Sequence, residues 1–286
     1  RGDFLTYALS SQPVGVYKFK EEYDKQQGHT TGWQEFVEAN PSLELQGGTS
    51  IFDPVLCEIV YKWFTPRGQT HILDPFAGGS VRGVVAGFLG KHYTGIELSS
   101  QQVIANRAQA KEILGKKKDH VTWIEGDSLR AIPKKEQYDL IFSCPPYFDL
   151  EQYGDDPRDL SNMGYTEFLQ TYRAIIQESV KHLKNGRFAC FVVGDVRDTD
   201  GNYRNFISET IKAFLDCGMK LYNELVFISP IGSLAMRAGR QFNTSRKAGK
   251  AHQNVLLFHK GLVFLKGEYE RTSFEKVIHI DLLQDA

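Results

Sequence analysis

The sequence has few cysteines, no long apolar run and no excess of either charge. Its four cysteines stand far apart without a Cys-x-x-Cys pair, which argues for a reducing compartment and against a zinc site. No apolar stretch reaches the length that a bilayer span needs, so we expect no membrane association. The 34 basic and 35 acidic residues give a formal net charge of -1, so a surface for a polyanion has to be local.

Other familiar signals are missing as well. The chain starts without an initiator Met or the apolar core of a signal peptide, so we expect a fragment or a processed protein. The eight histidines are not spaced as a zinc ligand set, and no metal site is expected. With 41% hydrophobic and 24% charged residues, the composition matches an ordinary folded protein of one large α/β domain with appendages or two small domains.

From residue 71 onward, apolar strands alternate with amphipathic helices. The pattern predicts an α/β fold with a doubly wound, mostly parallel sheet. Residues 1–48 are predicted to be a partly helical arm, 49–265 the main domain and 266–286 a C-terminal tail. Strands are expected at 71–74, 93–97, 121–125, 138–143, 187–193, 220–228 and 254–259, and helices at 81–89, 99–114, 165–183 and 203–216.

Polar and glycine-rich segments follow the first three predicted strands, where an open parallel sheet binds its ligands. In the first turn, Gly78 and Gly79 have no Cβ and let a ligand approach the backbone, while Ser80 is placed to cap the next helix. Glu97 ends the second strand, where a carboxylate can accept hydrogen bonds from ribose hydroxyls. Asp127 follows the third strand and suits an adenine amine, although a helix cap explains it nearly as well.

The fourth predicted strand ends in Phe-Ser143-Cys144-Pro145-Pro146-Tyr147. Two prolines cannot extend a strand or enter a helix, so we expect a rigid turn that holds carbonyl groups and an aromatic ring. A planar base with an amino group can stack on such a ring and donate to such a carbonyl.

Together, Asp74-Pro-Phe-Ala-Gly-Gly, Glu97, Gly126-Asp127-Ser128 and Cys144-Pro-Pro-Tyr147 resemble motifs I to IV of S-adenosylmethionine-dependent DNA methyltransferases that act on the exocyclic amine of adenine or cytosine. Residues 49–54 resemble motif X, 183–195 motif VI and its strand, and 252–258 the motif VIII strand. The resemblance covers about residues 49–260 in family order. It implies a Rossmann-like methyltransferase sheet and a cytoplasmic protein of a prokaryotic or phage-infected cell.

The resemblance also implies roles for individual residues. The methionine end of S-adenosylmethionine would lie near Asp53, Asp74, Phe76 and Gly78, its ribose at Glu97 and its adenine at Asp127. The target base would enter the pocket of Ser143, Cys144, Pro145, Pro146 and Tyr147. The full set expected to bind cofactor is Phe52, Asp53, Asp74, Phe76, Ala77, Gly78, Gly79, Ser80, Glu97, Leu98, Asp127 and Ser128.

Two positions depart from the family pattern. Ser80 replaces a second spaced glycine, and Cys144 stands where an Asp, Asn or Ser usually accepts the target amine. Because sulfur is a weak acceptor, Ser143 or the carbonyl of Pro145 would have to compensate. Three alternatives stay open: pyrimidine C5 transfer with Cys144 as nucleophile, transfer to an RNA amine, and an inactive module that binds cofactor and nucleic acid.

The stretch 229–254 contains no acidic residue, which favours a flexible basic loop that contacts the phosphates of a DNA partner. Its cations are Arg237, Arg240, Arg246, Lys247 and Lys250. The stretch 149–159 is acidic instead and is interpreted as a lid, a contact to the base or a segment that docks on the basic loop.

Overall fold

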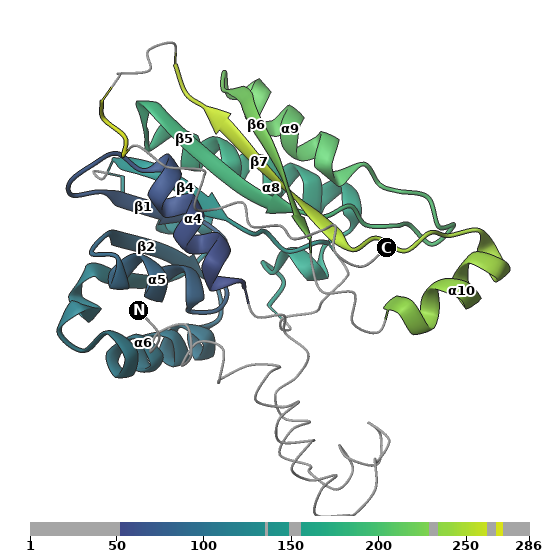
Figure 1. Cartoon of the computed structure of the whole chain (residues 1–286), viewed down its shortest axis with the longest axis horizontal. Helices are drawn as coiled ribbons and strands as arrows, with labels where there is room; N and C mark the ends of the chain where they lie inside the picture. The colour runs from purple at the N-terminus through teal and green to yellow at the C-terminus, as the bar shows by residue number, and fades with distance from the viewer. Residues whose placement is uncertain (1–51, 135–136, 149–155, 229–233, 262–266, 271–286) are drawn as a thin grey trace, which may run out of the picture. The chain divides into compact units, whose positions relative to one another are not determined.

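The computed structural model describes residues 52–134, 137–148, 156–228, 234–261 and 267–270 (Figure 1). The chain divides into two compact units, Arg1–Pro54 and Val55–Ala286. The sheet and its helices belong to the second unit, apart from the first residue of α4. The predicted N-terminal arm and most of the predicted C-terminal tail lie outside the described residues.

A seven-stranded sheet in the order β3-β2-β1-β4-β5-β7-β6 forms the centre of the second unit. The strands β1 to β5 are parallel to their neighbours, whereas β7 runs antiparallel to both β5 and β6. The predicted doubly wound, mostly parallel sheet is confirmed. The strands are β1 (His71–Asp74), β2 (His92–Glu97), β3 (Val121–Glu125), β4 (Tyr138–Ser143), β5 (Leu183–Val193), β6 (Lys220–Ile228) and β7 (His252–His259).

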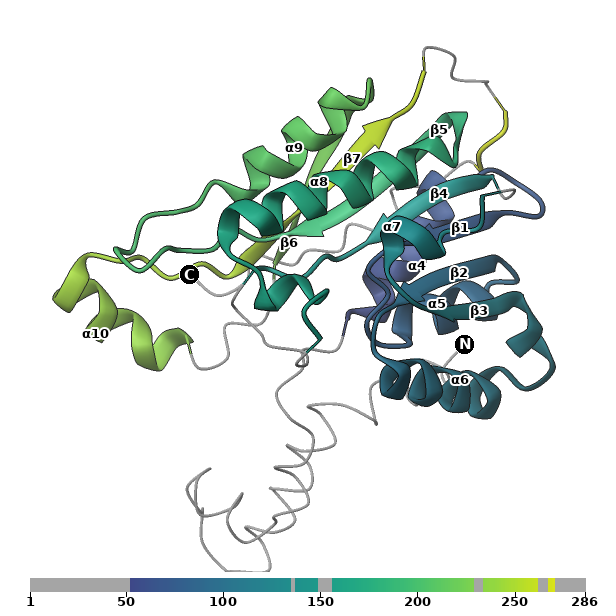
Figure 2. The ribbon, with the colours of Figure 1, turned by 180° about the vertical axis from the view of Figure 1, so that it is seen from behind.

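Helices cover both faces of the sheet. Figure 1 shows α4 in front of it, and Figure 2, from behind, shows α8 and α9 in front of it. The α-helices are α4 (Pro54–Phe64), α5 (Val81–Phe88), α6 (Ser100–Leu114), α7 (Ser128–Ala131), α8 (Tyr165–Lys181), α9 (Phe206–Asp216) and α10 (Leu234–Ser245). Two short 3-10 helices, η2 (Gly115–His120) and η3 (Leu160–Asn162), complete the set.

The core lies around β4 and β5. All six residues of β4 are buried, as expected for a central strand that is covered on both faces. Aromatic rings fill the layer between these strands and α8 and α9, and Phe168, Tyr172 and Phe206 are fully buried there. The edge strand β6 is largely exposed and ends the core on that side.

Most predicted elements agree with the structure to within a few residues, but two expectations differ. The strands β5 and β7 begin at residues 183 and 252, earlier than predicted, because β5 is paired from Leu183 and β7 from His252. The expectation of a flexible loop at 229–254 is wrong in part, because residues 234–245 form helix α10 and residues 252–254 belong to β7. The helix α4 was not predicted at all.

We expect Gly83→Ala to lower the free energy of unfolding by about 1–3 kcal/mol. A Cβ at Gly83 would lie 2.5 Å from a ring carbon of Trp123 and 2.9 Å from one of Tyr93, both of which are buried. The matched control is Gly239→Ala in α10, where a Cβ meets no atom within 4 Å. This change only removes the extra conformational entropy that a glycine loses on folding. Urea denaturation measures both, and equal stability of the two variants would contradict this packing.

Candidate functional site

The parallel pairing of β3, β2, β1 and β4 places the ends of these four strands next to one another along one edge of the sheet. The segments that follow these strands are those selected from the sequence: Gly126–Ser128, Glu97–Leu98, the turn 74–80 and Ser143–Tyr147. The structure therefore brings together the residues predicted for cofactor and target binding, except those in the first unit. This arrangement is what the strand-end rule for parallel sheets requires.

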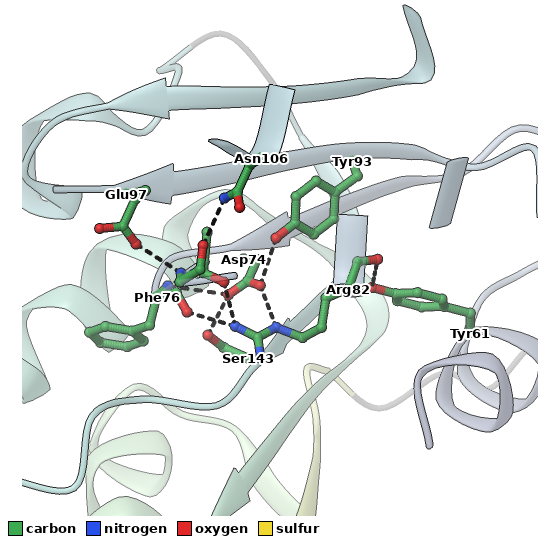
Figure 3. A network of polar contacts seen from close by, with 10 residues as sticks. Tyr61, Asp74, Phe76, Arg82, Tyr93, Glu97, Asn106 and Ser143 are labelled. Carbon is green, nitrogen blue, oxygen red and sulfur yellow. Dashed lines mark hydrogen bonds and ion pairs between the residues drawn. The ribbon is translucent and has the colours of Figure 1, made fainter. Parts of the chain in front are cut away.

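The carboxylate of Asp74 is the centre of a buried polar network (Figure 3). Its Oδ2 accepts from Arg82 Nε at 2.6 Å and from the Tyr93 hydroxyl at 2.8 Å. Its Oδ1 accepts from the Ser143 hydroxyl at 2.5 Å and from the Phe76 N–H at 3.2 Å. With 0% of its surface exposed, Asp74 is placed to shape the turn, and its predicted contact with the methionine end stays a prediction.

Arg82, in α5, belongs to the same network and connects it to the backbone of the turn 74–80. Its Nη2 donates to the carbonyl oxygens of Phe76 and Ala77, both at 2.8 Å. Burial by itself lowers the pKa of Arg82, but the charge and hydrogen bond of Asp74, together with Tyr93 and Cys144, outweigh this and raise it, so the guanidinium stays charged. Sequence reasoning missed Arg82, although a lone arginine within an apolar helix was a signal that it has a buried partner.

Gly78 is held from two sides. Its N–H donates to Glu97 Oε2 at 2.8 Å, and its carbonyl accepts from the Asn106 side chain at 2.7 Å. Its φ of 50° lies in the left-handed region that favours glycine. A Cβ built at Gly78 or Gly79 meets no atom within 4 Å, so the space above this turn is open to a ligand.

Glu97 is half-buried, and its two oxygens accept from backbone N–H groups of Gly78 and Ser99, each at 2.8 Å. Burial raises the pKa of Glu97 above its ordinary value, and the two backbone hydrogen bonds oppose this rise. Each carboxylate oxygen keeps a further lone pair. Glu97 can therefore hold the turn and still accept from a ligand hydroxyl. Leu98 beside it is half-buried.

The remaining cofactor candidates have mixed placements. Asp127 caps α7 by accepting from the Leu129 N–H at 2.9 Å, and the buried Ser128 hydroxyl donates to the Pro75 carbonyl at 2.6 Å. Ser80 occupies the N-cap position of α5, but the expected capping bond is absent because its hydroxyl donates to Gln109 instead. The half-buried Phe76 ring lies 5.7 Å from the ring of Tyr172.

The turn Cys144–Tyr147 is anchored at both ends. Ser143 is fully buried and committed to Asp74, and Pro145 is buried, while Cys144, Pro146 and Tyr147 are half-buried. The Tyr147 hydroxyl donates to the Val192 carbonyl at 3.3 Å and lies 3.5 Å from the Cys144 sulfur. The ring of Tyr147 is therefore held in one orientation over the end of β5.

Arg204 supports Phe148, the residue that follows this turn. Phe148 has a φ of 55°, a left-handed conformation that is uncommon outside glycine. The Arg204 guanidinium lies 4.9 Å from the Phe148 ring and 4.5 Å from the Tyr165 ring, a cation–π arrangement. It stabilises the backbone where the rigid turn ends.

The predicted basic residues lie at the same edge of the sheet as the site. The first residues of β7 pair with the last residues of β5 and β6, so the segment before β7 emerges where β5 ends. Lys247 lies against Gly201, and the charge of Asp195 acts on Lys250, whose pKa burial lowers. Arg240 and Arg246 are exposed, and Arg237 lies in the first turn of α10, whose side chains are not described.

Some predicted features stay untested. Phe52 and Asp53 belong to the first unit, which is not placed relative to the sheet. Most of the acidic stretch 149–159 lies outside the described residues, and within the rest Asp156 pairs with Arg158 at 2.6 Å. The described ranges contain no cluster of three potential metal ligands. They also contain no helix that is long and apolar enough to span a bilayer.

Comparisons with solved structures identify the fold. The chain is similar to the [4+2]-cyclase SpnF, with a TM-score of 0.51 and 15% identity over 73% of this chain and 82% of that one. An S-adenosylmethionine-dependent methyltransferase from Methanosarcina mazei gives 0.49 and 13% over 75% and 100%. TrmN from Thermus thermophilus gives 0.48 and 14% over 73% of this chain and only 49% of its own length.

No family model matches the chain, and neither does any curated protein. At these identities the likeness concerns the fold alone. The chain has a Rossmann-like fold, which it shares with SpnF, built on a seven-stranded sheet with one reversed strand.

We expect Tyr93→Phe to lower the free energy of unfolding by about 1.5–3 kcal/mol, because it removes a hydrogen bond to the buried Asp74 charge. The matched control is Tyr172→Phe, an equally buried tyrosine whose hydroxyl bonds the neutral Thr210 at 3.0 Å. That change should cost about 0.5–1.5 kcal/mol. Urea unfolding of both variants checks the order, and a larger loss in Tyr172→Phe would argue against a network centred on Asp74.

Proposed function

We propose that this protein transfers a methyl group from S-adenosylmethionine to the exocyclic amine of an adenine or cytosine in DNA. One observation carries the proposal. In the strand order β3, β2, β1, β4, the adjacent ends place Asp127, Glu97, the open glycine turn and the rigid Cys144–Tyr147 turn in a row. This row matches, end to end, what an adenine, its ribose, a methionine tail and a target base would need.

The residues present fit the cofactor. The open space above Gly78 and Gly79 accommodates the methionine end, and the free lone pairs of Glu97 accept from the ribose hydroxyls. Asp127 caps α7 through its Oδ1, and its Oδ2 suits an adenine amine. When bound, S-adenosylmethionine supplies a methyl group on a sulfonium, which is a good leaving group.

The chain's own residues mainly position the acceptor. The Tyr147 ring, held by the Val192 carbonyl, offers a flat surface for stacking a base that has been turned out of the duplex. A backbone carbonyl of the Pro-Pro turn can accept a hydrogen bond from the amine. This bond orients the nitrogen lone pair toward the methyl group and stabilises the positive charge that develops on nitrogen until it loses a proton to water. Because Ser143 is buried and bonded to Asp74, the backbone is the better acceptor.

Cys144 decides between amine transfer and C5 transfer. Its sulfur lies 3.5 Å from the Tyr147 hydroxyl, and the charge of the buried Arg82 guanidinium also interacts with it. C5 chemistry needs a thiolate that attacks the pyrimidine ring. Arg82 donates its hydrogen bonds to Asp74 and to the carbonyls of Phe76 and Ala77 instead, so we assign Cys144 to the wall of the base pocket.

We expect labelled S-adenosylmethionine and unmodified DNA of mixed sequence to yield N6-methyldeoxyadenosine or N4-methyldeoxycytidine after digestion to nucleosides. Cys144→Ser should retain at least about a tenth of the methylation rate, because serine is similar in size to cysteine and keeps the wall of the base pocket. Cys217→Ser, at the end of α9, is the matched control. If the product is 5-methyldeoxycytidine and Cys144→Ser abolishes it, the reaction is C5 transfer and not amine transfer. If only RNA is methylated, DNA is excluded as the substrate.

We also expect cofactor affinity to fall as the pH drops through the raised pKa of Glu97. Burial raises that pKa, so protonation, which removes an acceptor for the ribose, begins at a higher pH than for an exposed glutamate. Calorimetric titration with S-adenosylhomocysteine between about pH 5 and 8 measures this, with a loss of at most about tenfold per pH unit. In Glu97→Gln the affinity should be weaker and its pH dependence reduced, whereas an unchanged profile would remove Glu97 from the ribose site.

A further inference from the structure

The helix α10 stands apart from the sheet in both views of the molecule (Figures 1 and 2). It precedes β7, whose Asn254 pairs with Val193 at the end of β5. Because β4 and β5 are parallel and Ser143 pairs with Phe191, the Cys144–Tyr147 turn lies at that same edge. The helix therefore projects from the edge of the sheet at which the proposed base pocket lies.

The charge on this segment has one sign. No acidic residue occurs between positions 229 and 255, although the whole chain carries nearly equal numbers of acidic and basic residues. Within the described part of the chain, Arg240, Arg246 and Lys247 form no ion pair with a carboxylate. An ordinary solvated surface would mix both signs, so this surface is complementary to a polyanion.

The helix also has two different faces. By helix register, positions 240, 241 and 244 follow the spacing i, i+1 and i+4 and share one face. We call this the polar face, and it consists of Arg240, Gln241 and Thr244, all of which are exposed. Ala238 and Phe242 fall on the opposite side.

The end of α10 is well defined. Arg246 has a φ of 54° and donates its N–H to the Phe242 carbonyl at 2.8 Å, as in a left-handed helix cap. Its guanidinium lies 5.2 Å from the Phe242 ring. These contacts hold the last turn of α10, so that Gln241 and Thr244 are presented on regular helix rather than on loop.

We infer that the polar face of α10 reads base sequence in the major groove of duplex DNA. The inference rests on the proposed function and adds to it the part that selects the site. Twelve residues make a helix of about 18 Å, which covers about five base pairs. Arginine pairs with the guanine edge, glutamine with the adenine edge, and the threonine methyl contacts the thymine methyl. Lys247 and Lys250, beyond the helix, contact phosphates.

Duplex DNA fits this surface better than duplex RNA. The major groove of B-form DNA admits an α-helix, whereas that of A-form RNA is too deep and narrow for side chains to read. A protruding helix without acidic residues has the shape and the charge to enter the major groove of B-form DNA. A partner of mixed charge, such as a second copy of this chain, would leave the cations without counter-charge.

The test is selection of bound duplexes from a library with a randomised central segment, read by sequencing, with the full chain. The wild-type protein should enrich particular sequences. Arg240→Ala and Gln241→Ala should each relax the preference at one or two neighbouring positions, by about 10- to 100-fold in relative affinity. Asn243→Ala is the matched control, since it removes an equally exposed amide that lies off the polar face. It should leave the preference unchanged.

Lys247→Ala separates phosphate contacts from base reading. It should weaken binding to all sequences alike and reduce the slope of log affinity against log salt by about 1. Thermal unfolding shows whether each variant keeps its fold. The inference is overturned when the wild type enriches no sequence, when Arg240→Ala and Gln241→Ala keep its preference, or when an RNA duplex binds as tightly as DNA.

This outcome is independent of that of the methylation assay. Sequence enrichment without any methylated nucleoside would end the proposed function and leave base reading by α10 standing. Methylated DNA without a sequence preference that depends on Arg240 and Gln241 would support the proposed function and exclude base reading by α10.

Discussion

The ion pair between Asp74 and Arg82 is the interaction on which the rest of the site depends. Both side chains are almost completely buried, and a buried charge is tolerated only when its partners satisfy it fully. Asp74 therefore draws side-chain donors from three elements: Arg82 of α5, Tyr93 of β2 and Ser143 of β4. Removing any one of them leaves the others around an incompletely compensated charge.

The same network links the cofactor turn to the target turn. Arg82 fixes the carbonyls of Phe76 and Ala77, while Ser143 ties the start of the Cys144–Tyr147 turn to the same carboxylate. In-line transfer needs donor and acceptor atoms within a few tenths of an ångström of their working distance. On the proposed function, a shared buried anchor is a direct way to keep the two turns in register. It also explains why Ser143 is unavailable as the acceptor for the target amine.

The fold was predictable from this sequence, and the network was not. Strands β1 to β4 are recognisable in the sequence as short apolar runs that end in Gly, Pro or acidic residues. The parallel topology follows from the alternation of these strands with helices. The partners of Asp74 are 19 and 69 residues away in Tyr93 and Ser143, and no local pattern indicates such pairs. Helix α10 was missed because it lacks a core-facing apolar stripe of ordinary length, so its composition suggested a loop.

The antiparallel direction of β7 determines at which edge of the sheet the α10 segment lies. In a wholly parallel sheet, a connection between the last two strands would have to cross back along a face. Because β7 runs antiparallel to β5 and β6, the 229–251 connection is a hairpin insertion that opens at the edge where β4 and β5 end. Its length and side chains can change without disturbing Asp74 or the glycine turn. On our inference, base selection and methyl transfer therefore share one edge of the sheet but depend on separate sets of contacts.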